Sequence, residues 1–371
     1  MSKMGKVLVA MSGGIDSTVA AIMLHNQGYE VIGITMKTWD YATASPSNKK
    51  ETGCCNLDSF NDARQAAVDH GFPHYILDIR EEFGDAVIEN FVEEYLAGRT
   101  PNPCVMCNTH IKWSALLKRA DALDCDFIAT GHYVKVRQHT NGRYVVSKAV
   151  DSNKDQSYVL WGLGQECLSR SIFPLGEYTK PQIRQMAHDM GYPELAKKNE
   201  SYEICFVPDN DYRNFLKHRV DGLEAKVNGG SFVDTTGKII GQHKGYPFYT
   251  IGQRKGLDIA FGKPVFVTEI IPETNTVVLG DEEDLQKNTV QVAKLNLIKY
   301  AAIPEGIEAV TKIRYKDPGA LSVLHPNNNL VEVSFYNQVK GVAPGQSAVF
   351  YENDDVIGGG IIQKGFNFTN N

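Results

Sequence analysis

Short apolar runs alternate with longer amphipathic stretches over the first third of the chain, from Lys6 to about Gly131. The pattern predicts strands at Val7–Met11, Val31–Met36, His74–Asp78 and Phe127–His132, and helices at Asn61–His70 and His110–Leu123. Such alternation is typical of an α/β fold, in which a parallel sheet is covered by helices on both faces. Ligands of such sheets bind beyond the carboxyl ends of the strands, so the loops that follow the strands are expected to meet at one edge.

The pattern changes after about Phe215. A stretch rich in glycine and aromatic residues, including Gly241–Gly256, predicts a small β-rich region whose basic and aromatic side chains could contact RNA or simply pack. From about Asp281, period-two alternation and Gly, Pro and Asn turns predict a small antiparallel barrel. We therefore expect three domains, an α/β domain at 1–215, a central β-rich domain at 216–280 and a C-terminal barrel at 281–371.

The first predicted strand ends at a Ser12-Gly13-Gly14 turn, and an apolar helical stretch starts at about Ser17. Adjacent glycines let backbone amides converge on phosphate oxygens, and a helix N-terminus adds a positive dipole end. The loop is neither a Walker A loop nor a dinucleotide fingerprint, because Gly-Lys-Ser/Thr and Gly-x-Gly-x-x-Gly are both absent. The stretch favours anion binding over an ordinary strand-to-helix connection.

The composition indicates the cellular compartment of the protein and the use of its cysteines. The chain has 371 residues, a formal net charge of -6 and seven cysteines, and no long apolar run able to span a bilayer. Met1–Lys6 leads into a strand instead of a signal-peptide core, so we expect a cytoplasmic protein. In a reducing compartment, an odd number of cysteines indicates catalytic, metal-binding or core positions more than structural disulfides.

Cys104 and Cys107 form the most informative local motif, because they follow Pro101 and Pro103 and precede a predicted helix. A helix N-terminus stabilises thiolate and lowers a cysteine pKa, to which Arg99 and His110 could add. The pair permits a redox couple, half a zinc site or iron-sulfur ligation, and no other Cys-x-x-Cys occurs in the chain.

The other cysteines carry weaker signals. Cys54 and Cys55 end a polar stretch, Thr38–Asn56, that predicts a long mobile loop. Cys125 and Cys167 are expected in the core. Taken alone, Ile204–Val207 predicts a strand with Cys205 buried in it.

Together these motifs resemble a known family. Ser12-Gly13-Gly14-Ile15-Asp16-Ser17 resembles the PP-loop of N-type ATP pyrophosphatases, and with Pro101–Asn108 and Ser201–Pro208 the chain resembles the tRNA-specific 2-thiouridylases over nearly its whole length. The resemblance implies a catalytic domain of the adenine nucleotide alpha hydrolase type. It implies ATP-dependent 2-thiolation of the wobble uridine of tRNA, by adenylation of O2 and sulfur delivery from a cysteine persulfide.

The resemblance also implies roles for individual residues. Cys205 would carry the persulfide and Cys107 would be the second active cysteine. ATP, with Mg²⁺ near Asp16, would contact Ala10, Met11, Ser12, Gly13, Gly14, Ile15, Asp16, Ser17, Met36 and Gly131. The tRNA would contact Asn102, Pro103, Cys104, His132, Lys154, Asp155, Gln156, Arg314, Tyr315 and Gln346. Without the resemblance, Asp16 could equally be a carboxylate in the first turn of a helix, Met36 a core methionine and His132 a partly buried histidine. The segment Lys154–Gln156 could equally be a turn that caps a helix, and Arg314, Tyr315 and Gln346 could be groups on strand surfaces.

The implied partners are a tRNA of the Lys, Glu or Gln type with a wobble uridine and a persulfide sulfur-donor protein, with no membrane. Many family members have Asp at the position of Cys104, and the substitution creates a set of Cys104, Cys107 and Cys205 able to hold a [4Fe-4S] cluster. Persulfide transfer ranks first and cluster chemistry second. A small-molecule ATP pyrophosphatase ligase and an RNA-binding or redox-sensing protein are the alternatives from other classes.

Three further segments carry local predictions. Arg137–Lys148 predicts a charged hairpin, and Lys197–Glu200 a flexible approach to Cys205. Thr179 predicts the cap of a helix with a proline in its first turn and with exposed basic side chains, including Lys180, available to an RNA backbone.

Overall fold

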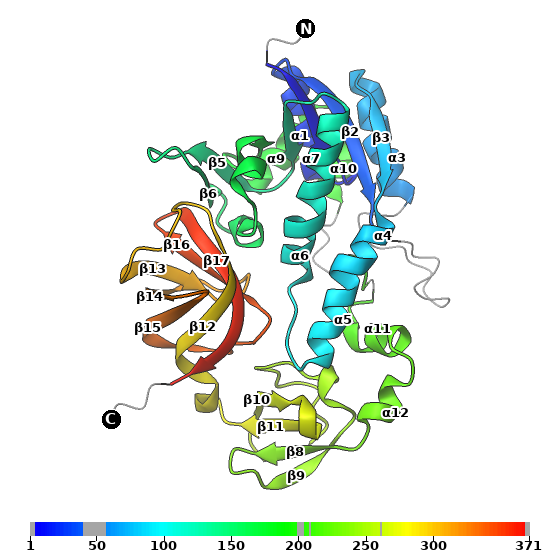
Figure 1. Ribbon diagram of the computed structural model, residues 1–371. Helices are drawn as coiled ribbons and strands as arrows, with labels where there is room; N and C mark the ends of the chain where they lie inside the picture. The colour runs from blue at the N-terminus through cyan, green and yellow to red at the C-terminus, as the bar shows by residue number, and fades with distance from the viewer. Residues whose placement is uncertain (1–3, 40–56, 199–203, 208, 260–261, 368–371) are drawn as a thin grey trace. The chain divides into compact units, whose positions relative to one another are not determined.

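The computed structural model describes residues 4–39, 57–198, 204–207, 209–259 and 262–367 (Figure 1). Cys54, Cys55 and nearly all of the predicted mobile loop therefore lie outside the described residues. The chain divides into two compact units. Unit 1 comprises residues 1–87, 104–210 and 354–356, and unit 2 comprises residues 88–103, 211–353 and 357–371.

Unit 1 is built on a five-stranded parallel sheet in the order β3-β2-β1-β4-β7. Its strands are β1 (Lys6–Ala10), β2 (Glu30–Lys37), β3 (His74–Asp78), β4 (Phe127–Thr130) and β7 (Ser171–Ile172). The predicted α/β fold is confirmed, and four of these strands were expected. Strand β7 was not, because two residues are too short to give an alternation pattern.

The helices of unit 1 pack on this sheet and on each other. Val7 and Val9 of β1 share a core with α1 (Ile15–Asn26) and α3 (Leu57–His70), while α7 (Trp113–Ala122) contacts β1 and β4. The remaining helical segments are α4 (Arg80–Phe83), the π-helix η2 (Cys107–Lys112), η3 (Ser157–Leu160), α8 (Gln165–Ser169), α9 (Lys180–Asp189) and α10 (Pro193–Lys197). Two short segments cross the boundary between the units, η1 (Gly84–Ile88) and α6 (Pro103–Met106). The charged hairpin is confirmed as β5 (Val134–Gln138) and β6 (Tyr144–Lys148).

Unit 2 contains the central β-rich region as a four-stranded sheet in the order β10-β11-β8-β9. Its strands are β8 (Gly230–Asp234), β9 (Ile239–His243), β10 (Phe266–Ile271) and β11 (Thr276–Gly280). The accompanying helical segments are α5 (Glu89–Leu96), α11 (Tyr212–Arg219), α12 (Leu223–Val227), η4 (Tyr246–Phe248), η5 (Pro272–Thr274) and η6 (Glu283–Leu285). Helix α5 precedes the cysteine motif in sequence yet clusters with these later residues.

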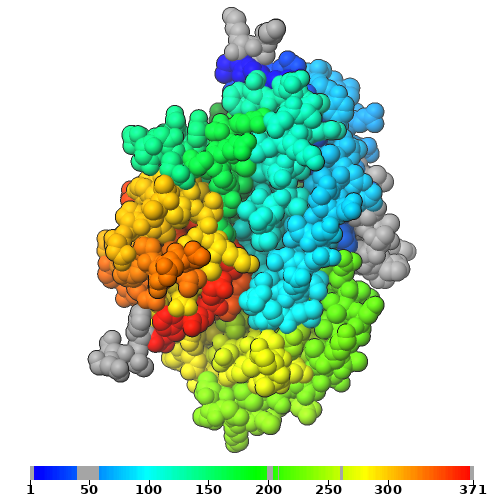
Figure 2. Space-filling model, in the orientation of Figure 1, coloured from blue at the N-terminus to red at the C-terminus, as the bar shows by residue number. Residues whose placement is uncertain are grey.

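The predicted C-terminal antiparallel barrel is also confirmed. Its strands run in the order β12-β15-β14-β13-β16-β17, and pairing of β12 with β17 closes the barrel. The bounds are β12 (Gln286–Leu297), β13 (Ile307–Lys312), β14 (Ala320–Asn327), β15 (Leu330–Lys340), β16 (Ser347–Glu352) and β17 (Asp355–Phe366). Inward-facing apolar residues such as Val290, Leu324 and Val333 are fully buried, as the period-two pattern requires. Figure 2 shows one face of this barrel, coloured gold to red, with closely packed side chains.

Two local expectations are wrong. Ile204–Val207 forms a turn closed by a 2.9 Å hydrogen bond from the Val207 amide to the Ile204 carbonyl, because local backbone bonding replaces the strand pairing that the apolar run suggested. The predicted flexible approach at Lys197–Glu200 is wrong at Lys197, which belongs to α10 because Pro193 at a first-turn position favours helix there. Asn199 and Glu200 lie outside the described residues. No helix in the described ranges is long and apolar enough to cross a membrane.

Candidate active site

The loop between β1 and α1 has the backbone geometry expected of an anion-binding turn. Gly13 has a φ of 72°, and a Cβ there would lie 1.9 Å from the Ser59 carbonyl oxygen, so only glycine fits. Gly14 is the N-cap of α1 and its side-chain position is uncrowded. The Ser12 amide donates to Ser17 Oγ at 3.0 Å, and that hydroxyl donates to the Gly14 carbonyl at 3.2 Å. The loop is therefore fixed from within, with the N-terminus of α1 beside it.

The ends of three strands meet at this loop. Ala10 pairs with Ile34 of β2 and Thr130 of β4. A Cβ on Gly131 would come within 2.8 Å of the Asp16 carbonyl carbon and the Ser17 nitrogen, so the end of β4 approaches the first turn of α1 very closely. The expectation that the loops after these strands share one edge is confirmed for β1 and β4. Of the other nucleotide candidates, Met11 and Ile15 are buried and Met36 is half-buried near the end of β2.

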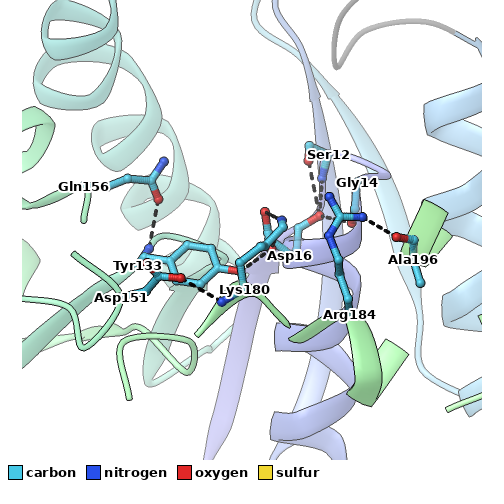
Figure 3. Close-up of polar contacts among 10 residues, drawn as sticks. Ser12, Gly14, Asp16, Tyr133, Asp151, Gln156, Lys180, Arg184 and Ala196 are labelled. Carbon is cyan, nitrogen blue, oxygen red and sulfur yellow. Dashed lines mark hydrogen bonds and ion pairs between the residues drawn. The ribbon is translucent and has the colours of Figure 1, made fainter. Parts of the chain in front are cut away.

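Asp16, in the first turn of α1, is held by two groups from distant parts of unit 1 (Figure 3). Lys180 Nζ contacts its two carboxylate oxygens at 2.7 and 2.8 Å, and the Tyr133 hydroxyl donates to one of them at 2.7 Å. Lys180 is only 5% exposed, so the expectation that it is open to an RNA backbone is wrong. A buried ammonium needs a counter-charge, and Asp16 supplies it.

Lys180 is positioned by the cap of α9. The Thr179 side chain and Gln182 form a capping box, which confirms the predicted threonine cap. The Lys180 amide donates to Asp151 Oδ2 at 2.9 Å. A lysine in the first turn lies at the positive end of the helix dipole, which is unfavourable without anionic partners. That unfavourable placement was the one sequence signal that Lys180 has a carboxylate partner.

Tyr133 joins this loop to the Lys154–Gln156 turn. The Tyr133 amide donates to Gln156 Oε1 at 2.9 Å, and the Gln156 amide donates to the Tyr133 carbonyl at 3.0 Å. Asp155 accepts from the Ala149 amide at 3.2 Å and from the Ser157 hydroxyl at 2.8 Å. The turn is thus ordered by its own candidate residues. Sequence analysis did not identify Tyr133, which is buried and carries no motif of its own.

His132 is held neutral beside the end of β4. Burial lowers its pKa from 6.5 to about 3, and the charge of Lys112 acts in the same direction. Its Nδ1 lies 2.8 Å from Thr130 Oγ1, and its ring centroid lies 5.5 Å from that of Trp113. At neutral pH, His132 therefore offers an uncharged ring.

The cysteine motif opens the helical run that starts with α6. Cys104 is exposed and Cys107 is buried in the π-helix η2, where the neighbouring Asn108 amide donates to the Val159 carbonyl at 3.1 Å. Desolvation by the surrounding protein raises the pKa of the Cys104 thiol, although solvent still reaches its side chain, and the charge of Lys112 offsets part of the rise. The expected lowering of the pKa by the helix start is wrong for Cys104, because desolvation outweighs the dipole.

The remaining cysteines are dispersed within unit 1. Cys205 is half-buried in its turn. The ring of the neighbouring Phe206 packs on that of Phe83, with 5.8 Å between the ring centroids. Cys125 is buried as expected and Cys167 is half-buried. Within the part of the chain that the structure describes, no group of three or more His, Cys, Asp or Glu side chains could hold a metal ion. Cys104, Cys107 and Cys205 are therefore not gathered into a cluster site.

The other tRNA candidates belong to unit 2. Arg314 and Tyr315 are exposed just after β13, whereas Asn102 is half-buried and Pro103 is buried. Gln346, just before β16, uses its side-chain amide within unit 2, donating to the Thr100 and Pro101 carbonyls at 3.1 and 2.8 Å. Arg99 pairs with Glu94 at 2.6 Å.

The fold and this loop define a nucleotide-binding α/β protein with an added barrel, and the comparisons give its family. Residues 5–209 match the family model described as tRNA methyl transferase HUP domain. Residues 213–281 match the model described as tRNA methyl transferase PRC-barrel domain, and residues 287–362 match the model described as Aminomethyltransferase beta-barrel domain.

Curated relatives align over almost the whole chain. The chain is 61% identical to the tRNA-specific 2-thiouridylase MnmA of Amoebophilus asiaticus, covering 98% of this chain and 96% of the relative. It is 63% identical to the protein of the same name from Cytophaga hutchinsonii, with 99% of each chain covered. The chain belongs to the tRNA-specific 2-thiouridylase family. A solved complex of a 4-thiouridine synthetase with RNA and bound ATP has 18% identity and a TM-score of 0.36, covering 59% of this chain and 51% of that chain.

Proposed function

We propose that this chain is an ATP-dependent tRNA sulfurtransferase that converts the wobble uridine of a tRNA to 2-thiouridine. The observation that carries the proposal is the identity of about 60% to relatives named tRNA-specific 2-thiouridylase over nearly the full length of both chains. The glycine loop at the N-terminus of α1 supplies the chemistry that such an enzyme needs for a nucleotide.

ATP binds with its phosphates on the loop from Ala10 to Ser17, and Met36 and Gly131 border the nucleotide. Uridine O2 attacks the α-phosphate, the bond from that phosphorus to the bridging oxygen breaks, and pyrophosphate leaves with the electron pair. The adenylated oxygen is then a good leaving group. Backbone amides and the dipole of α1 stabilise negative charge on the phosphates through this step.

The proposed role of Asp16 depends on its partners. Both of its oxygens contact Lys180, so the pair is nearly neutral towards an incoming polyphosphate. Asp16 would be the residue that holds a Mg²⁺ ion accompanying ATP, and it would do so only in part, because both of its carboxylate oxygens contact Lys180. Such an ion would neutralise charge on the phosphates.

Sulfur transfer is assigned to Cys205 and Cys107. A sulfur-donor protein leaves a persulfide on Cys205, and the Cys107 thiolate attacks the inner Cys205 sulfur. A disulfide forms and the outer sulfur leaves as hydrosulfide, which adds at uridine C2 while AMP departs with the former O2. An external thiol then reduces the disulfide and restores both cysteines.

RNA recognition is assigned to Asn102, Pro103, Cys104, His132, the Lys154–Gln156 turn, and to Arg314, Tyr315 and Gln346. The neutral ring of His132 could pack on a base without adding charge. The division into domains at 1–215, 216–280 and 281–371 is part of the same proposal, with RNA contacts on the first and last. A tRNA of the Lys, Glu or Gln type is the proposed substrate.

The cluster-dependent alternative has less support. Cys104, Cys107 and Cys205 do not form a ready metal site among the described residues, so no step is derived through a [4Fe-4S] cluster. Anaerobic purification followed by iron and sulfide analysis distinguishes the two routes. The persulfide route predicts full activity in preparations without iron.

The direct test incubates the protein with unmodified tRNA transcript, ATP, Mg²⁺ and a persulfide source, followed by nucleoside analysis by mass spectrometry. 2-Thiouridine should form with the wild type and be lost in Cys205→Ser and Cys107→Ser, whereas Cys125→Ser serves as the matched control. Absence of 2-thiouridine with the wild type, or full activity of Cys205→Ser, would remove the proposal.

A further inference from the structure

The segment that leads into the cysteine motif is tied down by the barrel within unit 2. Gln346 Nε2 donates to the Thr100 carbonyl at 3.1 Å and to the Pro101 carbonyl at 2.8 Å. The Thr100 amide donates to the Pro344 carbonyl at 2.8 Å. Three hydrogen bonds thus fix two consecutive residues that end two positions before Pro103, the first residue of α6.

The close approach depends on Gly345, between the two barrel residues that make these bonds. Its φ is 90°, and a Cβ there would lie 2.8 Å from the Thr100 oxygen and 2.9 Å from Glu94 Oε2. The backbone of Gln346 is itself fixed to β17, since the Ile362 amide donates to the Gln346 carbonyl at 2.8 Å. The barrel therefore holds the backbone of Gln346 in place just before β16, and the absence of a Cβ at Gly345 lets the two segments approach closely.

The other end of the same segment is held by the central β-rich region. The Tyr246 hydroxyl donates to the Leu96 carbonyl at 2.5 Å, and a Cβ on Gly98 would lie 2.7 Å from Pro272 Cγ. Arg99 adds a bidentate pair with Glu94. Residues 96–101 thus have fixed neighbours on two β-structures of unit 2.

We propose that Gln346 is a positioning residue, which anchors the backbone before the cysteine motif and so fixes where α6 and the Cys104–Cys107 pair begin. Both bonds that its side-chain amide is shown to make go to protein carbonyls, so this role is separate from the RNA contact proposed for Gln346 and does not depend on it. Pro101 and Pro103 have restricted φ angles on either side of Asn102. The backbone between the anchored residues and α6 therefore has little conformational freedom. The consequence for thiolation rests on the proposed function, but the anchor itself does not.

Gln346→Met tests the anchor, since methionine keeps the side-chain length and removes both donors. Gln363→Met is the matched control, because Gln363 is exposed on β17 and donates to the nearby Ile361 carbonyl of the same strand. In Gln346→Met, amide hydrogen exchange of a peptide covering residues 98–101 should be faster by about fivefold, and alkylation of buried Cys107 by about threefold. Both measurements are made without tRNA, so they report the anchor and not an RNA contact of Gln346.

In a thiolation assay of Gln346→Met, kcat should fall, whatever the change in KM for tRNA. If tRNA affinity instead falls by about tenfold while exchange and alkylation match the wild type, Gln346 is an RNA contact and the inference is wrong. Gln346→Glu keeps the shape, replaces the donors by acceptors and should show the same pattern more strongly. If the wild type forms no 2-thiouridine, the proposed function fails, yet exchange and alkylation still decide whether the anchor exists.

Discussion

Lys180 Nζ lies 2.7 and 2.8 Å from the two carboxylate oxygens of Asp16, and this ion pair joins the first turn of α9 to the first turn of α1. Each residue lies at the positive end of its helix, where Asp16 is favoured and Lys180 is not. Asp16 thereby stabilises an otherwise unfavourable lysine, and Lys180 offsets negative charge beside the loop that we propose binds phosphate.

Lys180→Met should weaken ATP binding, because Asp16 would then repel the phosphates. A charge-assisted contact of this kind is worth about 10-fold to 100-fold in affinity. Asp16→Asn in the Lys180→Met background should recover part of the loss by removing the repelling charge. Isothermal titration with ATP and Mg²⁺ measures both effects. The control is Lys197→Met, which removes an exposed ion pair with Glu194. Equal affinities of wild type and Lys180→Met would contradict this role.

Gly131→Ala should disturb the loop from the opposite side. The added methyl would meet backbone atoms of Asp16 and Ser17 at 2.8 Å, and backbone cannot yield as a flexible side chain can. We expect a loss of about 1–3 kcal/mol in the free energy of unfolding, together with weaker ATP binding. Urea denaturation checks the first effect. Gly84→Ala, where a Cβ meets open space in a helical segment, should be neutral or slightly stabilising.

Acid should destabilise unit 1 through His132. Its pKa is about 3 in the folded protein against an ordinary 6.5, so the unfolded chain binds the extra proton between these values. The stabilisation is complete above about pH 6.5 and is lost as the pH falls towards 3. Thermal unfolding across this window should show a flatter pH dependence in His132→Phe. His188→Gln, which changes an exposed histidine, should leave the slope as in the wild type.

Cys104 should alkylate slowly at neutral pH, because its raised pKa keeps the thiol protonated. The rate of iodoacetamide labelling, followed by peptide mass spectrometry, should keep rising with pH beyond the ordinary thiol range of about 8.5. Lys112→Met should shift the profile further upward, since it removes the charge that partly offsets desolvation. A labelling rate at Cys104 that already levels off near neutral pH would contradict the raised pKa.

Much of the architecture could be predicted from the sequence because it depends on local patterns. The apolar run at His74–Asp78 gave the bounds of β3, alternation gave the barrel, and a Ser-Gly-Gly turn between a strand and a helix gave the phosphate loop. These features follow from hydrophobic periodicity and from the backbone freedom of glycine, which neighbouring residues specify. The family resemblance added candidate roles for the cysteines.

Only the tertiary structure shows which residues far apart in the chain contact each other. Lys180 meets Asp16 across 164 positions and Gln346 meets Pro101 across 245, and neither separation leaves a periodic signal. The turn at Cys205 likewise replaced an expected strand, because a strand needs a pairing partner that an apolar run alone cannot supply. The sequence by itself determined where the candidate phosphate loop and the candidate active cysteines lie along the chain. Folding decided which side chains neutralise the loop and what anchors the cysteine segment, since charge pairing and anchoring depend on distance in space.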